Sequence, residues 1–71
     1  MNLLEFQNIV DAVVKNPTAI RYISGKTEYS GFYKGSKAKV IFTSAFDRYV
    51  VINGWKYHLN YKEMELKGER L

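Results

Sequence analysis

The sequence predicts an α+β fold in which an N-terminal α-helix precedes a curled five-strand antiparallel meander, closed into a small SH3-like barrel. Three observations predict this fold. Apolar residues recur at helical spacing over residues 2–15, the period changes to two from residue 18 onward, and glycine-containing turns interrupt the second part at regular intervals. We expect a single domain, residues 1–71, with a helix at about 2–15, a meander at about 18–66 and a frayed tail at 67–71.

The helix has signals at both ends and along one face. Asn2 is suited to the N-cap, and Glu5 three residues later completes a capping-box pattern. Asn16-Pro17 ends the helix, because proline disfavours the helical conformation in the residue before it. The apolar face consists of Phe6, Ile9, Val10, Val13 and Val14.

Two-residue turns set the register of the strands. Directly opposed residues of an antiparallel pair point to the same face, so each turn assigns residues to faces. The turns that we expect are Gly25-Lys26, Gly35-Ser36 and Asn53-Gly54. Their registers agree on one apolar inner face, formed by Ile20, Tyr22, Tyr29, Tyr33, Ala38, Val40, Phe42, Val50, Ile52, Trp55, Tyr57 and Leu59, with Tyr29 opposite Phe42.

Two segments have weaker signals. Residues 44–47 form the remaining connection, in which Asp47 suits a turn. The tail forms either a helical turn or a last short strand around Met64 and Leu66.

The composition limits the kinds of cofactor and metal site that the chain can form. The chain has 71 residues, a formal net charge of +4, one histidine and no cysteine. We therefore expect no cofactor and no metal site, since zinc, haem and iron–sulfur sites need Cys or His clusters. No phosphate-binding glycine loop is present either. An oligomer interface is one way for so small a domain to gain stability.

The charge and the hydropathy pattern indicate which partners the protein binds and where in the cell it is located. Residues 18–43 carry five basic side chains against one acidic one, a distribution that favours a polyanionic partner. No apolar run approaches the length of about 18 residues that spans a bilayer, and the N-terminus lacks the features of a signal peptide. The sequence predicts a cytoplasmic protein without a membrane partner.

Basic and aromatic residues gather on the predicted outer face. The candidate binding residues are Phe32, Lys34, Lys37, Lys39, Tyr49 and Lys56. Small sheet modules bind single-stranded nucleic acid in this way, by stacking bases on rings and pairing phosphates with cations. Nucleic acid, as a single strand or RNA, is therefore the first hypothesis. Lysines on a solvent face also simply discourage edge-to-edge aggregation.

A protein partner is the close alternative, because aromatic and basic residues are also enriched at protein interfaces. Under that hypothesis the chain is a small regulator or inhibitor that uses the same surface. The bias toward Lys, Asn, Ile and Tyr indicates an AT-rich genome and suits a phage or mobile-element accessory protein.

Catalysis is the third hypothesis and centres on His58. A metal-independent ribonuclease would use His58 with Lys56 and Tyr49, which the Asn53-Gly54 register places on the same face. An exposed histidine in an edge strand is the simpler interpretation. We therefore expect no catalytic residues and no enzyme.

The order of elements resembles that of the RNA-binding Sm-like fold, in which a short helix precedes a bent five-strand sheet. The resemblance covers the helix, AIRYISGKTEYSGFYKG and FDRYVVI. The segment KGSKAKVIFTSA lies where that family's strand pattern does not place it, and NYKEMELKG lacks the closing signature. No binding residue is carried over from the family.

Overall fold

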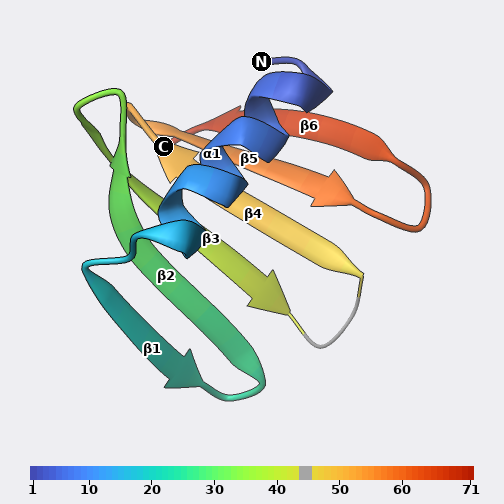
Figure 1. Cartoon of the computed structure of the whole chain (residues 1–71). Coiled ribbons are helices and arrows are strands. Elements are labelled where there is room, and N and C mark those ends of the chain that lie inside the picture. The colour runs from blue at the N-terminus through green and yellow to red at the C-terminus, as the bar shows by residue number, and fades with distance from the viewer. Residues whose placement is uncertain (44–45) are drawn as a thin grey trace.

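The chain folds into one N-terminal helix and a six-stranded antiparallel sheet (Figure 1). The structure is a computed structural model and describes residues 1–43 and 46–71. The elements are α1 (Leu3–Lys15), β1 (Ala19–Ile23), β2 (Lys26–Tyr33), β3 (Ser36–Thr43), β4 (Asp47–Ile52), β5 (Trp55–Asn60) and β6 (Glu65–Arg70). The α+β class predicted from sequence is confirmed.

Each strand pairs with its neighbours in the chain, giving the order β1-β2-β3-β4-β5-β6. Among the strands described, β1 and β6 each pair with one neighbour only, so the sheet is open. Closure into an SH3-like barrel is therefore not confirmed. The sheet has six strands where we expect five, because residues 65–70 pair with β5.

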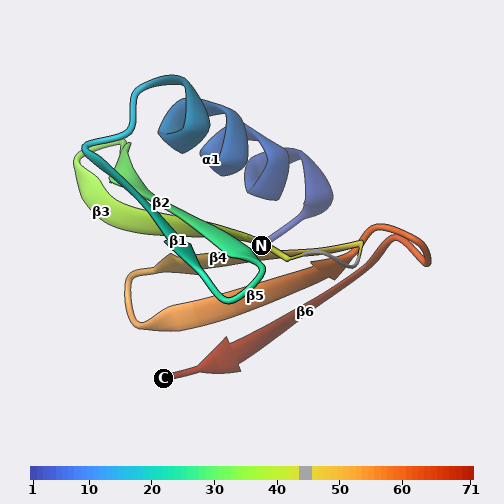
Figure 2. The same cartoon turned by 90° about the horizontal axis from the view of Figure 1, so that it is seen from below.

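Both ends of α1 have the predicted caps. The Asn2 side chain accepts a hydrogen bond from the Glu5 backbone N–H at 2.8 Å, and the Asn16 N–H donates to the Ala12 carbonyl. The helix lies across one face of the sheet and packs on β2, β3 and β4 (Figure 2). Its buried residues are Phe6, Ile9, Val10 and Val13, with Val14 partly buried beside them.

The core lies between α1 and the middle of the sheet. Val40, Val50 and Leu59 are fully buried there, and Ala38 and Ile52 extend the same layer. The partly buried rings of the inner face pack around them; they are Tyr29, Tyr33, Phe42 and Tyr57. The sheet therefore buries one face only, as the alternation in the sequence predicts.

The first two turns lie one residue earlier than we expect. They are Ser24-Gly25 and Lys34-Gly35, and both residues of each pair have positive φ, as in Asn53-Gly54. This is the type I′ geometry, which favours glycine at the second position. Moving a two-residue loop by one position shifts each partner by two residues, so Tyr29 pairs with Val40 instead of Phe42. A shift of two keeps every side chain on its predicted face.

Strand β1 is the main correction to the predicted core. Ile20 and Tyr22 belong to the inner face by register, yet they are 43% and 79% exposed. The reason is that α1 covers β2 to β4 and stops short of this edge. The predicted connection at 44–47 lies partly outside the described residues, and Asp47 is the first residue of β4 rather than part of a turn.

The predicted frayed tail is the second correction, since its residues up to Arg70 form β6. Gly68 lies opposite Tyr57 and allows the ring to rest on the backbone. A Cβ atom at Gly68 would lie 3.0 Å from Cε1 of Tyr57. The sequence analysis assigns this glycine to the frayed tail, whereas in the fold the Tyr57 ring packs on it.

The described helix is too short to cross a membrane.

Replacing Gly31 tests the contact between α1 and β2. A Cβ atom there would lie 3.4 Å from both the Asn16 carbonyl oxygen and Cγ1 of Val13. The larger Gly31→Val side chain must push the helix away from the sheet, and we expect the free energy of unfolding to fall by about 1–3 kcal/mol. Gly31→Ala is the control and should stay within about 1 kcal/mol of the wild type. Denaturant unfolding measures both, and equal stability of the two variants would contradict this packing.

Candidate functional site

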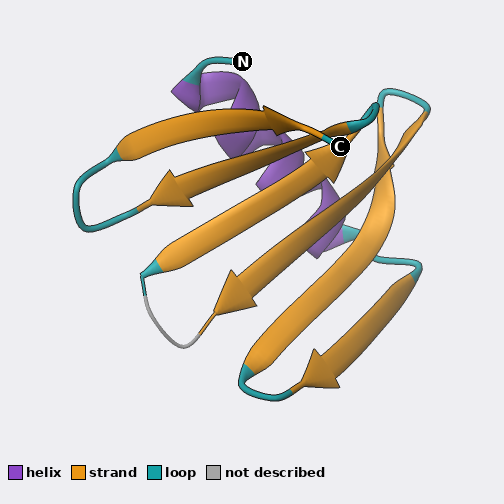
Figure 3. Cartoon of the chain, turned by 180° about the vertical axis from the view of Figure 1, so that it is seen from behind, coloured by secondary structure: helices purple, strands orange, loops and turns teal. Residues whose placement is uncertain are grey.

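The face of the sheet opposite α1 is uncovered in the part of the chain that the structure describes (Figure 3). We call it the open face. Its basic and aromatic residues are Arg21, Lys26, Phe32, Lys37, Lys39, Tyr49, Lys56, His58 and Lys67. Five of these belong to the six residues predicted from sequence, so the register brings most of the predicted site together.

One end of the open face is a groove beside Phe32. The Phe32 ring is 52% exposed and lies opposite Lys37. Both line a pocket of about 410 Å³ together with Lys39 and Val51. Lys39 Nζ lies 3.7 Å from the Glu28 carboxylate, which also approaches Arg21. Exposed ion pairs of this kind contribute little, so Lys39 can leave Glu28 for another anion.

The other end of the open face is a second pocket, also of about 410 Å³, which we call the His58 pocket. It is lined by Tyr49, Lys56, His58, Lys67, Gly68 and Glu69. The rings of Tyr49 and His58 stack with their centroids 4.6 Å apart and their planes 12° apart. Lys56 Nζ lies 4.8 Å from the centre of the Tyr49 ring. A cation–π contact therefore places a positive charge beside the stacked pair.

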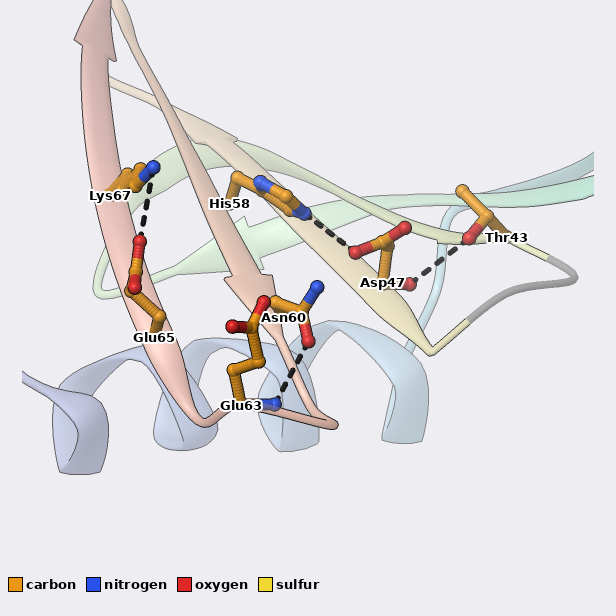
Figure 4. A network of polar contacts seen from close by, with 7 residues as sticks. All are labelled: Thr43, Asp47, His58, Asn60, Glu63, Glu65 and Lys67. Carbon is orange, nitrogen blue, oxygen red and sulfur yellow. Dashed lines mark hydrogen bonds and ion pairs between the residues drawn. The ribbon is translucent and has the colours of Figure 1, made fainter.

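Asp47 orients the histidine. His58 Nε2 lies 2.8 Å from Asp47 Oδ1, and both side chains are partly buried (Figure 4). The Asp47 backbone carbonyl also accepts a hydrogen bond from the Thr43 hydroxyl. The other ring nitrogen of His58, Nδ1, makes no hydrogen bond with the residues that the structure describes. The carboxylate thus fixes the ring and leaves one nitrogen available.

Strand β6 supplies the far wall of the His58 pocket. Lys67 lies directly opposite His58, and Glu69 directly opposite Lys56. Glu65 accepts a hydrogen bond from the Lys67 ammonium group, with Nζ and Oε1 3.0 Å apart, and this bond together with the carboxylate charge raises the pKa of Lys67. Lys67 therefore keeps its positive charge throughout the neutral range.

The structure separates Lys34 from the other predicted site residues. Lys34 occupies the first position of the β2–β3 turn with φ of 49°, and its Nζ lies 5.3 Å from the centre of the Tyr33 ring. It lines a pocket on the helix side with Glu5 and Ile9. The prediction that Lys34 shares a face with Lys37 and Lys39 is wrong, because the turn lies one residue earlier than we expect.

The sequence analysis does not identify the Asp47 contact of His58 or the β6 side of the His58 pocket. It assigns Asp47 to a turn, and Lys67, Gly68 and Glu69 to a frayed tail. The sixth strand also makes β5 an internal strand, so His58 is not on an edge strand as expected. The sequence offers a last short strand around Met64 and Leu66 as one of two alternatives, and Gly68 is a residue that weakens a strand pattern beyond that point.

Within the described residues, no group of three or more His, Cys, Asp or Glu side chains is placed to hold a metal ion. Comparison of the chain with protein-family models, with curated proteins and with solved structures finds no match. The function is therefore inferred from the geometry of the open face.

Substitution of Gly68 tests whether the Tyr57 contact holds β6, and with it the wall of the His58 pocket. Gly68→Val places a branched side chain where the Tyr57 ring lies, so we expect a loss of roughly 1–3 kcal/mol of stability. Hydrogen exchange should increase first in the amides of β6. Glu69→Val is the matched control, since it adds the same side chain one residue along on the open face. Equal effects of the two substitutions would show that the Tyr57 contact does not hold the strand.

Proposed function

We propose that this protein is a small binding module for single-stranded nucleic acid, RNA or DNA, which lies across the open face. The proposal rests on one observation: aromatic rings and lysine side chains lie together on the uncovered face of the sheet. Phe32 and the Tyr49–His58 pair offer ring surfaces at the two ends. Lysines lie beside both, so a strand finds base-stacking and phosphate-pairing groups together.

The cations of the open face are available to a ligand. Among the described residues, Lys37 makes no ion pair or hydrogen bond. Lys56 makes a cation–π contact with the Tyr49 ring and no ion pair with a described residue. The acidic residues nearby are mostly engaged: Glu28 contacts Arg21 and Lys39, Asp47 contacts His58, and Glu65 contacts Lys67. These pairings reduce the repulsion that a phosphate would otherwise meet on this surface.

The distance between the two pockets sets the length of strand that the face can hold. Phe32 is on β2 and Lys67 on β6, four strand spacings apart. The separation across the strands is roughly 19 Å at about 4.8 Å per spacing, and Phe32 also lies four residues along β2 from Glu28, the residue in the same row as Lys67. A site of about four nucleotides, the lower end of the range for small sheet modules, fits this span.

We expect binding to weaken steeply with salt, because phosphate contacts release counterions. If Lys37, Lys39, Lys56 and Lys67 each neutralise one phosphate, the plot of log K against log salt should have a slope of about −3. Fluorescence anisotropy with labelled single-stranded and duplex oligonucleotides, each at several salt concentrations, measures this slope. Absence of binding even at low salt would refute the proposal.

Single lysine substitutions locate the site. Lys37→Ala and Lys56→Ala should each weaken binding and make the salt slope shallower by about 0.7, the contribution of one phosphate on a single strand. Lys34→Asn is the matched control, since it removes a charge on the helix side of the same hairpin while asparagine tolerates the positive φ of the turn. A slope that changes equally in Lys34→Asn would place the ligand elsewhere.

Aromatic substitutions test how much base stacking contributes to affinity, separately from the contribution of charge. Phe32→Leu and Tyr49→Leu keep an apolar side chain but remove a ring face, and each should cost about 1–3 kcal/mol of binding free energy. The salt slope should stay unchanged in both, because no phosphate contact is lost. The same anisotropy titrations give both quantities. A changed slope with unchanged affinity at low salt would argue against stacking.

A protein partner is the second candidate, and strand β1 is the observation that favours it. Ile20, Tyr22 and Ile23 are 43%, 79% and 43% exposed on a strand that pairs on one side only among the strands described. Such an edge suits addition of a strand from another chain. A regulator or inhibitor would then act through β1, and failure to bind any oligonucleotide would favour this candidate. Either function suits the cytoplasmic location that we expect from the sequence.

A further inference from the structure

We propose that the His58 pocket cleaves the RNA strand that it binds, by transferring the phosphate to the neighbouring 2′-oxygen. The inference rests on the proposed binding of single-stranded nucleic acid and goes beyond it by adding a reaction. It also departs from the sequence-based expectation of no enzyme. The reason for the departure is Asp47, whose contact with His58 the sequence does not reveal.

Asp47 gives His58 the arrangement of a general base. The hydrogen bond between Asp47 Oδ1 and His58 Nε2 is 2.8 Å long and holds the proton of the neutral ring on Nε2. The lone pair is then on Nδ1, which makes no hydrogen bond with any described residue. Stacking on Tyr49 fixes the plane of the ring. A carboxylate that orients the base in this way is a positioning residue.

Four side chains form the corners of the pocket. His58 and Lys56 are two residues apart on one strand, which separates their Cα atoms by about 7 Å. Lys67 and Glu69 face them across the β5–β6 ladder, at about 5 Å. In the proposed complex the phosphate lies in this pocket, with His58, Lys56 and Lys67 around it. In-line transfer needs a base and an acid on opposite sides of phosphorus, and the proposal assigns these roles to His58 and Lys56.

The reaction needs no nucleophile from the protein, because RNA supplies its own 2′-hydroxyl. His58 Nδ1 removes the proton of the 2′-hydroxyl, and the 2′-oxygen forms a bond to phosphorus. The bond from phosphorus to the 5′-oxygen breaks, and the leaving oxygen takes a proton from the Lys56 ammonium group. Lys67, which stays charged beside Glu65, stabilises the negative charge on the phosphorane oxygens. The products are a 2′,3′-cyclic phosphate and a 5′-hydroxyl.

The test uses three labelled oligonucleotides of one sequence: RNA, 2′-O-methyl RNA and DNA. Each is incubated with the full chain in the presence of EDTA, and binding is measured on the same samples. We expect all three to bind and only RNA to be cleaved, with cyclic-phosphate ends identified by mass spectrometry. Cleavage of DNA or of 2′-O-methyl RNA would overturn the mechanism.

Variants test the roles of the residues. His58→Ala should lower the cleavage rate by roughly 10²–10⁴-fold, and added imidazole should restore part of it. Asp47→Asn should lower kcat while leaving the dissociation constant for RNA unchanged, a separation that loss of folding would not give. Lys34→Asn, on the helix side, should cleave at the wild-type rate. His58→Asn and circular dichroism serve as the check on folding.

The outcomes distinguish the two proposals. Binding of all three oligonucleotides without cleavage of RNA overturns the reaction and leaves the binding function standing. Absence of binding overturns both. Cleavage that persists unchanged in His58→Ala, purified in parallel, overturns the role of His58. Cleavage that is lost in His58→Ala, restored by imidazole and unchanged in Lys34→Asn establishes the site.

Discussion

The packing of one apolar helix face on one face of the sheet is the contact on which the rest of the structure depends. Phe6, Ile9 and Val13 are buried against Val40 and the strands around it. Gly31 lets the helix approach β2 closely, with its backbone near the Asn16 carbonyl. Among the described residues α1 is the one helix, and it packs on one side of the sheet. The open face is the side that α1 does not contact.

An uncovered sheet face needs polar and charged side chains to remain in contact with water. Here the same side chains are the ones proposed to bind the ligand. The open face carries lysines and carboxylates together with rings that are partly exposed rather than buried. Paired charges and the stack of Tyr49 on His58 give these side chains fixed positions. Groups held in place lose less entropy when a ligand binds, which favours ligand contact with the Tyr49–His58 stack.

Much of the fold could be predicted because its signals are local. The helix, its caps and the inner and outer faces of the strands depend on spacing within short segments. The faces were correct even though two turns were displaced, because a register shift of two residues preserves alternation. For the same reason Phe32, Lys37, Lys39, Tyr49 and Lys56 were placed on one surface. Lys34 was misplaced because it lies within a turn, where alternation ends.

The sequence by itself determined the α+β class, the helix, the hairpin at Asn53-Gly54 and the basic, aromatic character of one sheet face. Tertiary structure decided what covers each strand and what lies beside His58. The exposure of β1 depends on where the helix stops, and in β6 Gly68 lies against the Tyr57 ring of the neighbouring strand. Asp47 meets His58 only when β4 and β5 are paired, 11 residues apart in the chain. Such contacts depend on distance in space, which periodicity along the chain does not encode.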